Sequence, residues 1–341
     1  MSRRWVLRAL LAVACLGTAA VPGGASGQAN DGLIAGAITM GSAGATLDES
    51  ALSVRIIILE NEAVSGTVDA EVADGRYEAR VPAILSRTYV PVISYRGVQY
   101  FVPPAILDGA APEVIQDVTV YETTTERPDL TVESTVVTVV AIDRDLGQMG
   151  LLREDLVRNP SDRVYVGGEG GVTLRLPAPE GTLEGSGDNP EGTFTLEAGG
   201  ISAALPIRPL STTSVITRYL VEYDVQEDAY LLRVTAPLQT DRVAVRVPEG
   251  FLRGMEPEGE ARRADDERIG EGATANTLRV VEQSGVGPGQ GLIVRLDGFA
   301  PERNVNTLTE PSGAAIGAAT ALVLLAGAVA VAATRRRREA A

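Results

Sequence analysis

The chain lacks histidine altogether, and its one cysteine is Cys15. A Ser-His-Asp triad, a cysteine-histidine zinc site and a Cys-x-x-Cys-His haem attachment all need side chains that this sequence does not supply. A disulfide within the chain would need a second cysteine. Burial of apolar surface must therefore stabilise the fold, and thiolate or imidazole catalysis is excluded for everything after Cys15.

Lysine is absent as well, so all 30 basic residues are arginine. Schiff-base catalysis and the lysine of a phosphate-binding P-loop are therefore excluded. The 45 acidic residues outnumber the arginines and give a formal net charge of −15. Such a surface repels nucleic acid, and we expect no nucleic-acid partner.

Residues 1–29 have the three-part form of a signal peptide. Three arginines stand near the start, residues 9–20 are apolar, and small residues lead to a cleavage site near Gln28 or Asn30. The segment SRRWVLR at residues 2–8 is similar to the twin-arginine export motif. General secretion is the alternative, because a lysine-free chain can charge a signal peptide only with arginine.

The other end of the chain predicts a membrane anchor. Residues 313–334 carry no charge and are long enough as a helix to span the hydrocarbon core of a bilayer. Arg335, Arg336, Arg337 and Arg338 follow directly, and positive residues stay on the cytoplasmic side. We expect a polar stalk at 301–312, a transmembrane helix at 313–334 and a cytoplasmic tail at 335–341, with the bulk of the chain outside the cytoplasm.

Two further features of this end leave alternatives open. Gly313, Gly317 and Ala321 match the small-residue pattern of paired membrane helices, which makes a homodimer an alternative to a monomer. The sequence TEPS at residues 309–312 is similar to the start of exosortase sorting tails. A surface protein processed by an exosortase is therefore the alternative to a permanent anchor.

Between its ends, the chain has the pattern of an all-β protein. Short β-branched runs such as LSVRIIIL at 52–59 are separated by turn residues, among 37 glycines and 19 prolines. Asp74-Gly75 and Arg96-Gly97 are typical of β-hairpin turns. No long amphipathic helix is visible. We expect two β-sandwich domains plus one C-terminal transmembrane helix.

The first domain, residues 30–124, resembles a known family. The opening strand GLIAGAIT, the apolar run ALSVRIIILE and the hairpin DGRYEARVP are similar to the carboxypeptidase regulatory-like family. The resemblance implies a transthyretin-like seven-strand sandwich that acts as a structural or binding accessory module. It carries no catalytic residue over to this chain.

We expect the second sandwich at residues 125–300. Its opening strand is LTVESTVVTVVAID, and NPSDRVY at 159–165 contains an Asx-type turn. With the glycine-rich turn and VTLRLP that follow, this segment looks like the second domain of exported, tail-anchored bacterial proteins. Residues 253–275 have little apolar content and predict a disordered acidic loop.

Carboxylates and tyrosines remain as candidate site residues. The carboxylates gather at Asp143 with Asp145, at Glu154 with Asp155, and at residues 265–267, but their spacing fits neither a calcium loop nor a glycosidase pair. We therefore predict no catalytic residue, no metal site and no cofactor. Three tyrosines could form a ligand or partner surface at a hairpin: Tyr89, Tyr95 and Tyr100.

These features together predict a non-enzymatic, single-pass, membrane-anchored envelope protein. It would act outside the cytoplasm as a scaffold or accessory binding subunit for an envelope or membrane protein. The alternative from another class is a carbohydrate- or calcium-binding adhesion module that uses the acidic loops and the tyrosine hairpin.

Overall fold

A computed structural model describes residues 31–108, 110–269, 276–300 and 302–304. Over these residues the chain is all-β, as the sequence predicts, with only two short 3-10 helices, η1 (Glu49–Ala51) and η2 (Glu169–Gly171). No helix within the described ranges is long and apolar enough to cross a membrane. The predicted signal peptide (1–29) and transmembrane helix (313–334) lie outside the described residues.

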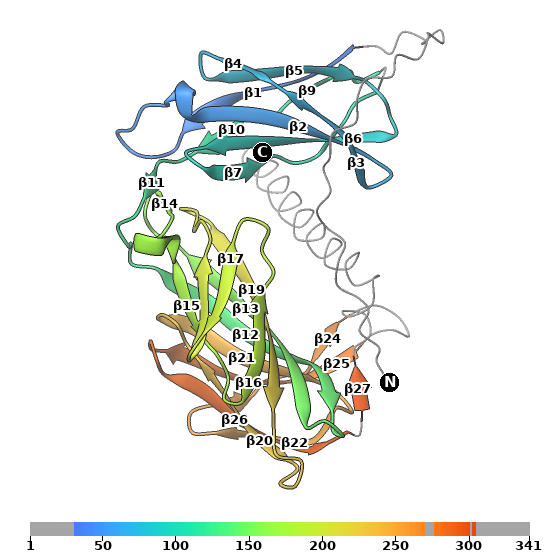
Figure 1. Ribbon diagram of the computed structural model, residues 1–341, viewed down its shortest axis with the longest axis vertical. Helices are drawn as coiled ribbons and strands as arrows, with labels where there is room; N and C mark the ends of the chain where they lie inside the picture. Colours follow the sequence, from blue (N-terminus) through green and yellow to red (C-terminus); the bar gives the residue numbers. More distant parts are fainter. Residues whose placement is uncertain (1–30, 109, 270–275, 301, 305–341) are drawn as a thin grey trace, which may run out of the picture.

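The first β-sandwich-like unit comprises residues 31–120 (Figure 1). Its strands are β1 (Asp31–Met40), β2 (Leu52–Glu60), β3 (Ala63–Asp69), β4 (Glu71–Ala73), β5 (Arg76–Pro82), β6 (Arg87–Tyr95), β7 (Val98–Phe101), β8 (Ala105–Ile106), β9 (Glu113–Ile115) and β10 (Val118–Val120). One sheet has the order β10-β1-β5-β4, with β9 also on β1, and the other has the order β3-β2-β6-β7, with β8 also on β6. The two sheets enclose a common apolar core.

Period-two alternation explains which residues fill this core. In β5 the side chains of Tyr77, Ala79 and Val81 are buried, and the residues between them are exposed. Both predicted hairpin turns are confirmed. Asp74-Gly75 (φ 52° and 67°) joins β4 to β5, and Arg96-Gly97 (φ 48° and 79°) joins β6 to β7. Positive φ at both central residues is the signature of the type I′ turn.

The second unit consists of a large sheet faced by two small ones. Its strands are β12 (Thr131–Asp143), β13 (Gln148–Arg158), β15 (Leu174–Pro177), β16 (Thr182–Gly187), β17 (Thr193–Glu197), β18 (Gly200–Ala204), β19 (Thr212–Glu222), β20 (Ala229–Thr235), β21 (Thr240–Pro248), β22 (Leu252–Glu258), β23 (Arg262–Arg263), β24 (Glu267–Ile269), β25 (Asn276–Val286), β26 (Gly291–Phe299) and β27 (Glu302–Asn304). The nine-stranded sheet has the order β16-β19-β13-β12-β21-β25-β23, with β24 on β25 and β27 on β12. The sheets β15-β18-β17 and β20-β26-β22 complete the unit, and residues of all three sheets share one core.

The predicted disordered loop at 253–275 is wrong for residues 253–269, which form most of β22 and all of β23 and β24. Met255 of β22 is 1 % exposed, and Arg246 of β21 forms an ion pair with Glu267 at 2.8 Å. This ion pair crosses β25, with which both β21 and β24 pair, so charged partners on other strands hold the segment despite its low apolar content. Residues 270–275 lie outside the described part of the chain.

The predicted stalk also begins differently, because residues 302–304 form β27. Strand β12 pairs with β21 only from Val132 to Thr138. Its far end, Ala141 to Asp143, therefore has a free edge on that side, and β27 pairs with it. The remaining stalk residues, 305–312, lie outside the described residues.

The two units lie end to end and are joined by a small parallel sheet (Figure 1). It consists of β11 (Thr123–Thr124), which follows the first unit, and β14 (Val164–Tyr165), which belongs in sequence to the second. The connection between the units is therefore a hydrogen-bonded structure.

Candidate functional site

The junction of the two units is organised by a turn whose centre is Asn159. This side chain is fully buried. Its Nδ2 donates to the carbonyl oxygens of Arg163 (2.8 Å) and Ile207 (2.9 Å), and its Oδ1 accepts from the backbone N (3.0 Å) and Oγ (2.7 Å) of Ser161. An asparagine with all these bonds fixes the turn in one conformation.

The turn presents Asp162 to the first unit. Oδ2 of Asp162 accepts a hydrogen bond from the backbone N of Ala43 (2.7 Å), and its carbonyl oxygen accepts one from Ser42 Oγ (2.6 Å). Ser42 Oγ in turn accepts from the backbone N of Glu122 (2.9 Å). One aspartate and one serine thus connect the NPSD turn, the loop after β1 and the chain that leaves the first unit.

Strand β14 contributes one side chain to each of the two cores. Val164 is fully buried among residues of the first unit. Tyr165, 5 % exposed, is buried among residues of the second. Successive side chains of a strand point to opposite faces, so a two-residue strand between the units can serve both. The first core is therefore incomplete without a residue that lies in the second unit's sequence.

An ion-pair cluster supports the junction on the first unit's side. Glu122 accepts from the Tyr95 hydroxyl (2.6 Å) and pairs with Nε of Arg96 (2.9 Å). Arg96 Nη2 lies 3.4 Å from Oδ2 of Asp48. Burial, together with the hydrogen bond to Glu122, raises the pKa of Tyr95 above its usual value. The cluster holds the β6–β7 turn against the connection between β10 and β11, which leads into the junction.

Arg208 forms the matching contact from the second unit. Its Nη2 donates to the carboxylate of Glu191 (2.6 Å and 2.7 Å) and to the carbonyl oxygen of Gln99 in β7. Its guanidinium lies 5.7 Å from the centre of the Tyr100 ring, a cation–π distance. The contact also covers part of the edge of β7, which would otherwise offer a free backbone to other strands.

The structure places the three predicted surface tyrosines inside the first unit. Tyr89 and Tyr95 are 0 % exposed and Tyr100 is 7 % exposed. Their hydroxyls donate to the carbonyl oxygen of Pro82, to Glu122 and to the carbonyl oxygen of Tyr121, respectively. The rings are thus part of the core and of the junction, and they are not available as an exposed binding platform.

Each acidic group singled out from the sequence contains a carboxylate with a structural partner. Asp143 accepts from the backbone N of Leu146, Glu154 accepts from Ser214 Oγ, and Glu267 pairs with two arginines. No group of three or more potential metal ligands comes together among the described residues.

Asp155 differs from the other carboxylates of these groups because it is fully buried. It is 0 % exposed, and its carboxylate binds Nε of Arg153 (2.7 Å) inside the second core. Thr135 also donates to Asp155, at 2.6 Å. Arg153 donates in addition to the carbonyl oxygens of Pro177 (2.9 Å) and Thr235 (3.2 Å). These carbonyls end β15 and β20, so one arginine ties the large sheet to both small sheets.

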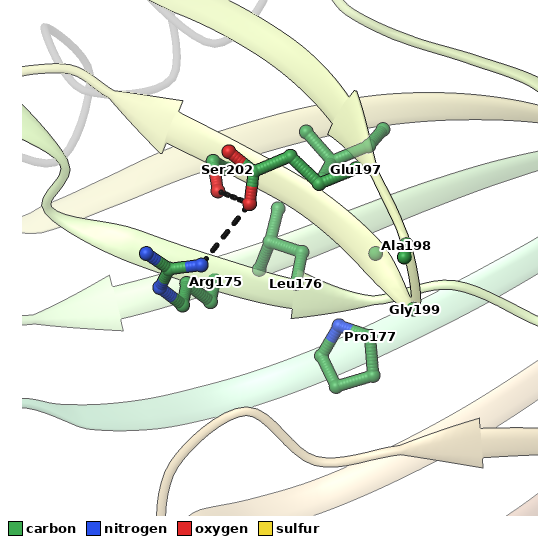
Figure 2. Close-up of a pocket in the computed structure, with 9 residues that line it drawn as sticks. Arg175, Leu176, Pro177, Glu197, Ala198, Gly199 and Ser202 are labelled. Atoms are coloured by element: carbon green, nitrogen blue, oxygen red, sulfur yellow. Dashed lines mark hydrogen bonds and ion pairs between the residues drawn. The ribbon is translucent and has the colours of Figure 1, made fainter.

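A small cavity of about 130 Å³ lies on the sheet β15-β18-β17 (Figure 2). In it, Oε2 of Glu197 accepts from Arg175 Nη1 (3.1 Å) and from Ser202 Oγ (2.8 Å). The carboxylate therefore already has two donors. A larger cavity of about 310 Å³, which Arg175 also lines, lies next to the junction.

The remaining predicted site residues lie outside the described part of the chain. These are the helix-pairing candidates Gly313, Gly317 and Ala321 and the topology anchors Arg335–Arg338.

Neither a comparison with protein-family models nor one with curated proteins finds a match to this chain.

The junction is the feature that sequence reasoning missed. The NPSD turn was predicted as a local turn, and its long-range contacts with Ser42 and Ala43 have no signal in a single sequence. Val164 and Tyr165 do carry a signal in the sequence. A strand with one buried face alternates apolar and polar residues, whereas these two consecutive residues are both apolar.

Proposed function

We propose that this chain is a non-enzymatic, single-pass membrane-anchored envelope protein whose exported part is a scaffold or accessory binding subunit. The observation that carries the proposal is the junction. Asn159, Asp162 and Val164 fix two β units as one elongated body, and such a body can hold a partner at a set distance from its anchor.

The finer architecture belongs to the same proposal. Both units are β-sandwiches, and the first is transthyretin-like, in keeping with the resemblance of residues 30–124 to the carboxypeptidase regulatory-like family. Residues 1–29 direct export, residues 313–334 span the membrane, and Arg335–Arg338 keep the tail in the cytoplasm. The acidic exported part remains in solution and does not adhere to anionic lipid.

In-cell photo-crosslinking of the full chain tests the partner. A benzophenone amino acid is placed at Ile115 (61 % exposed) or Leu231 (48 % exposed), and at Val234 (2 % exposed) as the buried control. We expect at least one exposed position to give a discrete adduct with an envelope or membrane protein, and the buried control to give none. A chain that extracts in mild detergent as a monomer and gives no adduct from exposed positions would contradict the proposal.

Intact mass tests the anchor. The chain purified from membranes should lack only about the first 29 residues and should retain its C-terminal arginines. A mass that corresponds to a chain ending near Pro311 would contradict the permanent anchor and support the processed surface protein.

A further inference from the structure

We propose that the outer face of the sheet β3-β2-β6-β7, the side turned away from the first core, is a contact surface for a second copy of this chain. The same face of that copy packs against it. The inference goes beyond the proposed function, because it concerns a contact between two copies of the chain and not one with another protein.

The register of the strands defines which side chains share this outer face. In β6, Tyr89, Ile93 and Tyr95 point into the first core. The side chains of β6 between them therefore point outward, together with the residues paired with those positions on β2, β7 and β8 and the residues of β3 in register with β2. The partly or fully exposed apolar residues on this side are Ile57, Leu59, Val64, Val90, Phe101 and Ile106.

The apolar surface continues from one edge of the sheet to the other. Val64 on β3 is 67 % exposed, Phe101 on β7 is 50 % exposed and Ile106 on β8 is 58 % exposed. Ile57 of β2 and Val90 of β6 are paired with each other between these edges. A contiguous apolar patch marks an interaction surface, whereas single exposed apolar side chains do not.

The two outer faces of the first unit differ in charge. Among the described residues that the register places on the outer face of β3-β2-β6-β7, the charged ones are Arg55 and Asp69, and they pair with each other at 2.9 Å. On the other sheet, β5 alone presents Arg76, Glu78 and Arg80 outward. An antiparallel sheet usually meets water with a polar face, and this unit has such a face on one side only.

A second copy is the occupant that these charges favour. The chain has a net charge of −15, so two copies repel each other over most of their surface. The balanced pair Arg55–Asp69 adds no net charge to the contact, so two copies approach through this face with little repulsion. The same patch on both copies also meets the requirement of a two-fold interface. Two sheet faces pack about 10 Å apart with interdigitated side chains.

The area of the face is sufficient for such a dimer. Strands β2 and β6 have nine residues each. They are therefore about 30 Å long, and four strands are about 19 Å wide. Because β3 and β7 are shorter, the face covers about 500 Å² in each copy. The total of about 1,000 Å² for two copies is at the lower end of specific interfaces, so we expect a reversible dimer.

In-cell photo-crosslinking of the full chain tests this contact in the native membrane. A benzophenone amino acid replaces Phe101, an exposed aromatic residue on the proposed surface. We expect a covalent dimer in which mass spectrometry finds peptides of this chain alone.

Ile106→Asp and Ile115→Asp form a matched pair of variants for the same experiment. The two isoleucines are 58 % and 61 % exposed, but Ile106 lies on the proposed surface and Ile115 is paired with Ala35 on the outer side of the other sheet. Ile106→Asp should lower the yield of covalent dimer at least about tenfold, because an unpaired carboxylate is costly in an apolar interface. Ile115→Asp should leave the yield unchanged.

Val64→Asp repeats the test from β3, at the opposite edge of the same face, and should also lower the yield. All three variants should melt at the wild-type temperature in circular dichroism, because the replaced side chains are exposed. A loss of dimer is then a loss of contact and not of folding.

A wild-type yield from Ile106→Asp, an equal loss from Ile115→Asp, or no covalent dimer from position 101 would overturn the inference. An internal adduct to residues 305–341 in place of the dimer would also overturn it, because the chain's own C-terminal segment would then be the occupant. An adduct to a different protein in place of the dimer would overturn the second copy and support the proposed function. Adducts from Ile115 and Leu231, which lie outside this face, test the proposed function separately.

Discussion

At the scale of single residues, the least expected feature is the ion pair inside the second core. Arg153 and Asp155 are two positions apart on β13 and so point to the same face, which the large sheet turns toward the core. The segment REDLVR at 153–158 does not alternate between polar and apolar residues, so nothing in the sequence indicates that the face with Arg153 and Asp155 is the buried one. Glu154 and Asp155 form a candidate pair in the sequence because they are adjacent, although their side chains point to opposite faces of β13.

Removal of one member of this pair should be strongly destabilising. Asp155→Ala leaves a buried guanidinium without its counter-ion, and we expect the free energy of unfolding to fall by about 3–5 kcal/mol. The double variant Arg153→Met/Asp155→Leu should lose less, because no charge remains buried alone. Urea unfolding followed by circular dichroism measures both.

The control for that experiment is the exposed pair Arg80–Glu78, whose side chains are 71 % and 51 % exposed. Glu78→Ala should change stability by no more than about 0.5 kcal/mol. If Asp155→Ala were as mild as Glu78→Ala, the buried pair would have no structural role.

At the scale of strands and turns, the sequence correctly predicted the elements whose structure depends only on residues close together in the chain. The I′ turns at Asp74-Gly75 and Arg96-Gly97 follow from two residues each, and β5 follows from strict alternation. Strands β22 to β24 were missed because their order depends on partners distant in sequence, such as Arg246 for Glu267. The division of the second layer into two sheets is equally non-local, because it involves β15 and β20, strands distant in sequence whose last carbonyl oxygens both accept from Arg153 of β13.

The need for glycine at position 187 of β16 is also set by a residue on another strand. A Cβ on Gly187 would lie 2.0 Å from Cγ of Phe194, which belongs to β17. Gly187→Ala should therefore displace the ring and lower stability by about 1–3 kcal/mol. The double variant Gly187→Ala/Phe194→Ala should lose less than the sum of the two single variants, as measured by a thermal double-mutant cycle.

Gly66 of β3 provides the matched control, because nothing lies within 4 Å of the Cβ that would be added there. Gly66→Ala should be neutral or slightly stabilising. Equal effects of the two alanine substitutions would contradict the close approach of β17 to β16.

At the scale of the whole molecule, composition limits the pH range in which stability can change, and burial of tyrosines sets the change at alkaline pH. After residue 29 the chain has no histidine, cysteine or lysine, so no side chain ordinarily titrates between about pH 6 and 9. Burial, and to a lesser extent the charge of Asp117, raise the pKa of Tyr77 from 10.0 to about 12. The same direction holds for Tyr100, Tyr219 and Tyr223, again mainly through burial.

The sign of the effect follows from proton linkage. Below pH 10 tyrosine is protonated in both the folded and the unfolded chain, and its contribution to stability is fully present. Between pH 10.0 and about 12 the unfolded chain releases the Tyr77 proton before the folded chain does, and stability falls. We expect a constant unfolding free energy from about pH 6 to 9 and a decline above pH 10, with a shallower decline for Tyr77→Phe. A decline that begins near neutral pH would contradict this assignment.

The contact between the two units also concerns the whole molecule. A domain boundary at residue 124 does not predict this contact. Val164 is preceded by more than thirty residues of the second unit, yet its side chain is fully buried in the first core. Val164→Ala should therefore create a cavity in the first unit. We expect amides of β1 and β6 to exchange with solvent about tenfold faster, equivalent to about 1.4 kcal/mol for the two lost methyl groups.

Hydrogen exchange of the full chain, followed by mass spectrometry, measures this effect strand by strand. Val157→Ala is the matched control, because Val157 is also 0 % exposed but belongs to the second core. It should accelerate exchange in β13 and β19. Faster exchange confined to the second unit in Val164→Ala would contradict the shared strand. Faster exchange in β1 and β6 would support one elongated body, because a residue of one unit would then stabilise the other across the junction.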